Sequence, residues 1–80
     1  MQEFIKKSKD IVLKYLNMTD RSPDEIYVVW SCKTLQNKKT ILSTDLVNDI
    51  LFEITYNGDK DETYVDVYKK WENFKIEDVK

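Results

Sequence analysis

The only thiol of the chain lies in the segment Trp30-Ser31-Cys32-Lys33. A cysteine near a cation can act as a nucleophile, but it needs a neighbouring base or a lowered pKa to do so. The chain has no histidine, so the commonest general base and the commonest transition-metal ligand are both missing. The segment has the composition of a β-strand, in which adjacent side chains point to opposite faces. Lys33 is therefore badly placed to activate Cys32, and we expect a buried cysteine that packs as a small hydrophobic residue.

Five carboxylates lie near two expected turns, and carboxylates in a loop can bind calcium. These residues are Asp45, Asp49, Asp59, Asp61 and Glu62. An EF-hand loop needs the spacing D-x-[DN]-x-[DN]-G, whereas the segment NGDKDE places its glycine before the aspartates. That glycine is the only one in the chain, too few for a glycine-rich phosphate loop. We predict no catalytic residue, no metal site and no cofactor, and we expect the protein not to be an enzyme.

Length and composition predict one small domain over residues 1–80. Hydrophobic residues make up 41% of the chain, which is enough for a core. The net charge of −2 disfavours broad, non-specific binding to nucleic acid. No apolar run approaches the roughly 20 residues of a membrane span, and the N-terminus lacks the apolar centre of a signal peptide. A single cysteine permits no internal disulfide, and we expect a soluble protein of the cytoplasm.

Hydrophobic spacing predicts one helix followed by three strands. Apolar residues at positions 4, 5, 11, 12, 15 and 16 share one face of a helix. Pro23 cannot continue that helix, and a run rich in β-branched and aromatic residues follows it. The expected elements are a helix over residues 2–17 and strands over 26–35, 40–44 and 50–56, with a hairpin loop at 36–39 and a turn at 45–49.

The segment after the turn signal Asn57-Gly58 fits two structures. As a helix over residues 60–74, it has an apolar stripe, acidic residues at its start and lysines at its end. As a strand, TYVDVY has good β-propensity. We predict the helix, and hence an α+β fold in the order α-β-β-β-α, with a three-stranded antiparallel sheet and both helices on one face. The alternative has a fourth strand in place of the second helix.

The first strand carries apolar side chains on both faces, which indicates a binding surface. Its even-numbered residues, including Trp30 and Cys32, have the composition of a core side. If the helices cover that side, the odd-numbered side is left for a partner protein, or for a second copy in a homodimer. The candidate partner-binding face consists of Tyr27, Val29, Lys33, Leu35, Leu51 and Glu53.

A nucleic-acid module is an alternative, since double-stranded-RNA-binding domains also have the order α-β-β-β-α. Such domains contact phosphates through the loop after the first strand and the start of the last helix. Lys38 and Lys39 would lie in that loop. The start of the expected last helix is acidic, however, and would repel phosphate, so the residues favour a protein partner over nucleic acid.

Four stretches of the chain together form a pattern: VVWSCKTLQN-K at 28–38, LST at 42–44, TYNGDK at 55–60 and Y-x-D-x-YKKWEN at 64–73. With these stretches the chain resembles a family of small uncharacterised proteins encoded by tailed phages and prophages of Gram-positive bacteria. This resemblance implies a phage accessory protein that acts in the cytoplasm of the bacterial host. The family has no assigned activity, so no functional residue is carried over.

Together, these features predict a non-catalytic factor that binds a host or phage protein. It would act as an inhibitor if it covers the surface of a host protein such as a defence nuclease. The alternatives are a small nucleic-acid-binding module and a homo-oligomeric protein that sequesters a ligand between its subunits.

Overall fold

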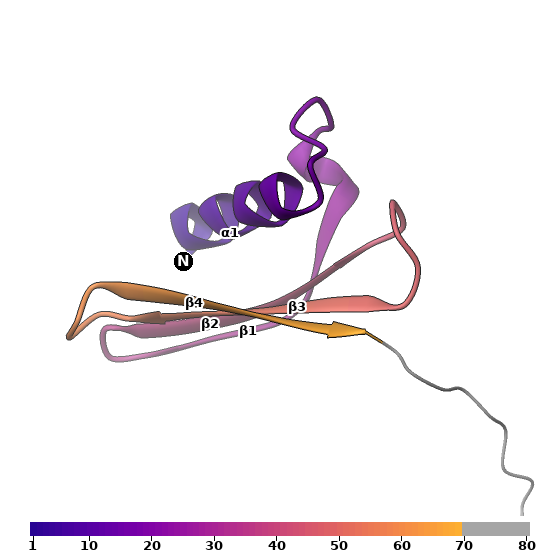
Figure 1. The fold of residues 1–80 in the computed structure, drawn as a ribbon. Helices are drawn as coiled ribbons and strands as arrows, with labels where there is room; N and C mark the ends of the chain where they lie inside the picture. The colour runs from indigo at the N-terminus through magenta and orange to yellow at the C-terminus, as the bar shows by residue number, and fades with distance from the viewer. Residues whose placement is uncertain (70–80) are drawn as a thin grey trace, which may run out of the picture.

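One α-helix and a four-stranded antiparallel sheet form the structure, a computed structural model that describes residues 1–69 (Figure 1). Each strand lies beside its neighbour in the sequence, in the spatial order β1-β2-β3-β4. The elements are α1 (Gln2–Tyr15), the 3₁₀-helix η1 (Pro23–Glu25), β1 (Ile26–Thr34), β2 (Asn37–Thr44), β3 (Ile50–Asn57) and β4 (Glu62–Lys69).

The predicted C-terminal helix is wrong for residues 62–69, which form β4, and the alternative of a fourth strand fits the structure. The turn at Asn57 and Gly58 folds the chain back along β3, and β4 then pairs with β3 over all its residues. The apolar stripe at Tyr64, Val67 and Tyr68 also suits a strand, since Tyr64 and Tyr68 lie on one face and Val67 on the other. Residues 70–74 of the predicted helix lie outside the described residues.

The loop predicted at 36–39 is shorter than expected. β2 begins at Asn37, so Leu35 and Gln36 alone form the turn between β1 and β2. Leu35 has a φ of 56°, in the left-handed region that glycine and asparagine adopt more easily than leucine. The helix predicted over 2–17 ends at Tyr15, and Asn17, with a φ of 59°, lies just beyond that end.

The core lies between α1 and one face of the sheet. Alternate residues of β2 and β3 point toward the helix, and those at the centre of the sheet are buried, as are the residues of α1 that face them. The Tyr15 ring packs edge-on against Phe52, with 5.7 Å between the ring centroids. The buried hydrophobic residues are Phe4, Val12, Leu13, Ile26, Leu42, Phe52 and Ile54.

Among residues 1–69, three polar side chains are buried in this core, and each hydroxyl donates a hydrogen bond to a backbone carbonyl. Ser8 Oγ donates to the Phe4 carbonyl at 2.7 Å, within the helix. Thr40 Oγ1 donates to the Trp30 carbonyl at 3.1 Å. Thr44 Oγ1 donates to the Glu25 carbonyl at 2.7 Å. Burial of these hydroxyls therefore leaves none of them without a partner.

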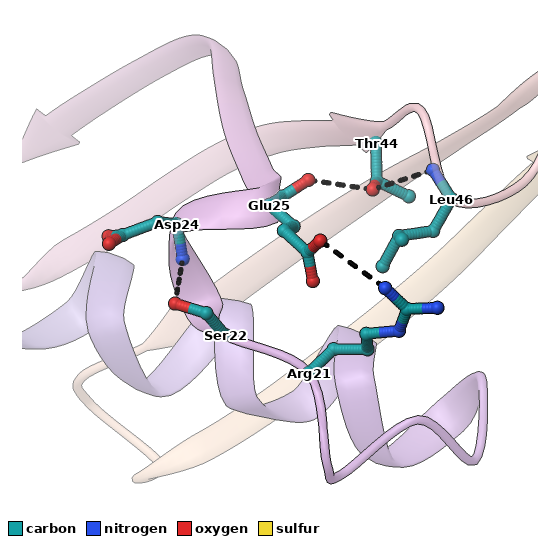
Figure 2. Close-up of polar contacts among 6 residues, drawn as sticks. All are labelled: Arg21, Ser22, Asp24, Glu25, Thr44 and Leu46. Carbon is teal, nitrogen blue, oxygen red and sulfur yellow. Dashed lines mark hydrogen bonds and ion pairs between the residues drawn. The ribbon is translucent and has the colours of Figure 1, made fainter.

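The connection from α1 into the sheet is fixed to the loop between β2 and β3 (Figure 2). Thr44 links the two segments, because its hydroxyl donates to Glu25 and accepts from the Leu46 N–H at 3.1 Å. Ser22 caps η1 by accepting from the Asp24 N–H at 3.2 Å. An exposed ion pair between Arg21 and Glu25, at 3.5 Å, adds little to stability.

The two hairpin turns meet at the other end of the sheet, where the only glycine lies. A Cβ at Gly58 would lie 2.3 Å from the Gln36 carbonyl oxygen, so no larger residue fits there without movement of the backbone. The Gly58 N–H donates to Asn37 Oδ1 at 3.1 Å, and the Gln36 side chain donates to Asp59. These contacts hold the first hairpin against the second.

Truncation of Phe52 and of Trp30 should have very different effects on stability. Phe52→Ala empties a fully buried site and should lower the free energy of unfolding by about 3–5 kcal/mol. Trp30→Ala removes a half-exposed side chain and should cost at most about 1 kcal/mol. Urea denaturation followed by circular dichroism measures both values. Equal losses would contradict the placement of Trp30 outside the core.

Candidate functional site

Helix α1 covers only one face of the sheet, and no other described element covers the opposite face (Figure 1). We call this opposite face the open face. Its members alternate with the buried residues along each strand. The open face consists of Tyr27, Trp30, Cys32, Lys39, Ile41, Ser43, Leu51, Glu53, Thr55, Tyr64, Asp66 and Tyr68.

A β-bulge in β1 decides which residues of that strand belong to the open face. Val28 pairs with Leu42, but Trp30 pairs with the next residue back, Ile41, so Val29 is the extra residue. One extra residue reverses the alternation of every side chain that follows it. The Thr40 hydroxyl donates to the Trp30 carbonyl at this point and so fixes the bulged strand to β2.

The bulge corrects the prediction for the second half of β1. Trp30 and Cys32 were expected on the core side, but they lie on the open face, paired with Ile41 and Lys39. Cys32 is exposed rather than buried, and its Sγ lies 3.8 Å from Thr34 Oγ1.

The predicted partner-binding residues separate into two groups. Tyr27, Leu51 and Glu53 do lie on the open face. Lys33 does not, because it pairs with Lys38 on the helix side of the sheet. Val29 is the bulge residue itself. Leu35 lies in the hairpin turn, where its side chain is 82% exposed.

Sequence reasoning missed four open-face residues that are large and apolar or aromatic: Trp30, Ile41, Tyr64 and Tyr68. The alternation in TYVDVY could have placed the two tyrosines on one face, if this segment had been predicted as a strand instead of a helix. No local signal marked Trp30, because its facing depends on the register between β1 and β2.

Lys38 and Lys39, the candidate nucleic-acid contacts, are adjacent on β2 and therefore point to opposite faces. Lys39 lies on the open face, with its Nζ 3.7 Å from a carboxylate oxygen of Glu53. Lys38 lies on the helix side, with its Nζ 5.8 Å from the centroid of the Tyr56 ring. The two lysines therefore form no common cationic patch.

The pairing of the four strands arranges the open-face side chains in three rows that run across the sheet. The middle row runs Trp30, Ile41, Glu53 and Asp66. The row toward the hairpin turns runs Cys32, Lys39, Thr55 and Tyr64. The third row holds Tyr27, Ser43, Leu51 and Tyr68. Aromatic side chains thus occur on both edge strands. Glu53 lies between these strands on β3, and Asp66 lies between Tyr64 and Tyr68 on β4.

The carboxylates on and beside the open face make it negatively charged, and they raise the pKa values of two of its tyrosines. Glu53 is the main cause that raises the pKa of Tyr68, followed by partial burial of the ring and by Asp66. A hydrogen bond from the Tyr64 hydroxyl to Glu62 raises the pKa of Tyr64. In both cases a nearby negative charge disfavours the phenolate.

A polar cavity of about 250 Å³ lies on the helix side, between α1 and the hairpin turns. It is lined by Glu3 and Asp61 and by the oppositely charged Lys7 and Lys38. Tyr56 donates to Asp61 at 2.8 Å, and this bond is the main cause that raises the pKa of Tyr56. The balanced charges attract neither anions nor cations strongly, so the cavity has no clear ligand class.

Residues 1–69 hold no group of three or more histidine, cysteine, aspartate or glutamate side chains placed to bind a metal ion. No helix in this part of the chain is both long and apolar enough to cross a membrane.

Comparison with known proteins gives one finding. A family model described as a family of unknown function, DUF6275, matches residues 5–78. The match extends over nearly all of the helix and the whole of the sheet. No curated protein and no solved structure matches the chain.

Loss of the Thr40 hydroxyl should weaken the bulge. Thr40→Val keeps the side-chain shape but leaves the Trp30 carbonyl without this donor, so the free energy of unfolding should fall by about 1–2 kcal/mol. Thr55→Val, on the open face, is the matched control and should change stability little. Thermal unfolding of the two variants checks this, and an equal effect would contradict the role of Thr40.

Removal of the Glu53 charge should lower the pKa of Tyr68 toward its ordinary value of about 10. In the native protein the raised pKa means that stability is full below pH 10 and is lost as the pH rises through the higher folded value. Glu53→Gln should therefore reduce the alkaline loss of stability. NMR titration of ¹³C-labelled tyrosine rings, with Tyr68→Phe for assignment, measures the pKa directly. Glu62→Gln is the control, and it should move Tyr64 instead of Tyr68.

Proposed function

Because the chain belongs to the DUF6275 family, whose function is unknown, we propose a function from the open face itself. We propose that the protein is a non-catalytic binding module that docks on another protein through this face. The observation that carries the proposal is the exposure of aromatic and aliphatic side chains on a sheet face that α1 leaves uncovered.

The apolar content of the open face fits a protein interface. Tyr27, Trp30, Leu51, Tyr64 and Tyr68 are between 43% and 52% exposed. Scattered apolar residues are normal on protein surfaces, but here they occur on three strands of one face. Tyrosine and tryptophan are also the residues most enriched at the centres of interfaces, where they contribute most of the binding energy.

The charges on the open face indicate the chemistry of the partner. Lys39 pairs with Glu53, which leaves Asp66 of the middle row without a cation among residues 1–69, and Tyr64 and Tyr68 flank it on β4. An arginine or lysine of a partner could pair with Asp66 and stack on a tyrosine ring. We therefore propose a partner surface with an apolar centre and basic groups around it.

The open face supports a protein partner better than nucleic acid. Exposed aromatic residues on a four-stranded sheet can stack on unpaired bases. Phosphates, however, would meet Glu53, Asp66 and Glu62 on or beside the same face, and they would find Lys39 already paired. Electrophoretic mobility shift with single-stranded and duplex DNA and RNA at low salt separates the two, since binding with a steep salt dependence would favour nucleic acid.

The resemblance to phage and prophage proteins supports a bacterial host protein as the partner. Binding would then take place in the host cytoplasm. Binding would inhibit the partner if it covers a surface that the partner needs for its own activity. A defence nuclease is an example of such a partner. This part of the proposal rests on the resemblance and the first part on the open face, so the two can fail separately.

Substitutions on the open face should abolish capture of a specific partner. The bait is the full chain with a photo-crosslinking residue in place of Ile41, incubated with lysate of a Gram-positive host. Trp30→Ala and Tyr68→Ala should each weaken the affinity for the captured protein, once it is purified, by about 30-fold or more, as for residues at an interface centre. Calorimetric titration measures this change.

Two exposed residues away from the open face serve as matched controls. Leu35→Ala in the turn and Lys33→Ala on the helix side should leave the affinity within about twofold, because neither belongs to that face. The proposal is wrong if no protein is captured in a manner that depends on Trp30 and Tyr68. It is equally wrong if the two control substitutions weaken binding as much as those on the open face.

A further inference from the structure

The two edges of the sheet differ in their protection against pairing with another strand. β1, at one edge, carries the bulge at Val29, and a bulge blunts an edge. Charge does not make this difference, since β4 carries Glu62, Asp66 and Lys69 and β1 carries Lys33. β4, at the other edge, pairs with β3 without a register shift from Glu62 to Lys69. It contains neither glycine nor proline. In the described part of the chain, no strand lies on its outer side.

β4 also exposes apolar side chains on both of its faces. Tyr64 and Tyr68 lie on the open face. Val65 and Val67 lie on the helix side, opposite Ile54 and Phe52, but they remain 39% and 37% exposed. Helix α1 packs on the central strands and leaves these valines in contact with solvent. A long, regular edge strand with exposed apolar groups is a ready template for one more strand.

We propose that β4 pairs in antiparallel fashion with β4 of a second copy, joining two four-stranded sheets into one of eight strands. Antiparallel pairing of a strand with itself generates a twofold axis, so each copy offers the same surface to the other. Side chains of directly opposed residues lie on the same face, so the axis must pass through a residue position.

Charge selects the register. With the axis at Val65, the register places Tyr64 opposite Asp66 of the second copy and Glu62 opposite its Tyr68. Each of these carboxylates then faces a tyrosine hydroxyl, and Thr63 faces a valine. With the axis at Asp66, the two Asp66 carboxylates would oppose each other, which is destabilising. The register centred on Val65 pairs the residues from Glu62 to Tyr68 of each copy without a like-charge pair.

The paired form leaves the open face free and makes it continuous across both copies. Edge pairing uses the outward backbone N–H and C=O groups of β4, whereas partner docking uses the side chains of the open face. The two proposals share Tyr64, Asp66 and Tyr68, but pairing depends on the backbone of the β4 edge, so each can fail without the other. A dimer without a partner, or a partner bound by a monomer, would tell the two apart.

Light scattering after size-exclusion chromatography tests the pairing on the full chain. The expected mass is twice the 9.6 kDa of one chain. Val65→Lys, which places a charge on the bare edge, should give a monomer. Val29→Lys, on the opposite edge, is the matched control and should stay dimeric. A wild-type monomer at the highest soluble concentration would overturn the proposal, as would a dimer lost only in Val29→Lys.

Crosslinking keeps the test valid if Val65→Lys fails to fold. Cys32→Ser with Val65→Cys should form an intermolecular disulfide under mild oxidation, because the two Val65 positions face each other at the twofold axis. Cys32→Ser with Val29→Cys should form little. Equal crosslinking of the two variants would contradict the register and the choice of edge.

Discussion

The extra residue in β1 is the constraint on which the surface of this protein depends. Val28 and Trp30 pair with consecutive residues of β2, so the chain has two alternation patterns within one strand. The Thr40 hydroxyl, buried under α1, holds the Trp30 carbonyl at the junction. Without the bulge, Trp30 would enter the helix side and Lys33 the open face. The bulge therefore places an aromatic residue, Trp30, on the open face, where an unbulged strand would place the cation Lys33.

The second constraint is the size of the single helix. An α-helix is about 10 Å wide, and strands lie about 4.8 Å apart, so one helix covers roughly two of four strands. α1 accordingly buries β2 and β3, where the fully buried residues Leu42, Phe52 and Ile54 lie. Apart from Ile26 at the start of β1, the edge strands stay largely exposed on the helix side, and the open face is partly or fully exposed. The uncovered face carries aromatic and aliphatic side chains in this protein, and exposed apolar surface of this kind is where partners can bind.

The two surfaces proposed for binding use different chemistry. The open face offers rings with a carboxylate beside them, which suits a partner with basic groups and an apolar centre. The β4 edge offers backbone donors and acceptors, which suit a strand of any sequence whose charges do not clash. A dimer formed through the edge would present two open faces in one plane. Such a dimer would engage a symmetric or repeated partner more tightly than one copy could.

The sequence by itself determined the elements that depend on local spacing. The helix from Gln2, the core alternation of β3 and the turn at Asn57-Gly58 all follow from residues close together in the chain. Pairing decided the rest. The segment from Glu62 had signals for both helix and strand, and contact with β3 selected the strand. The facing of Trp30, Cys32 and Lys33 depended on register with residues of β2 on the far side of the hairpin turn, because a bulge is visible only when two strands are aligned.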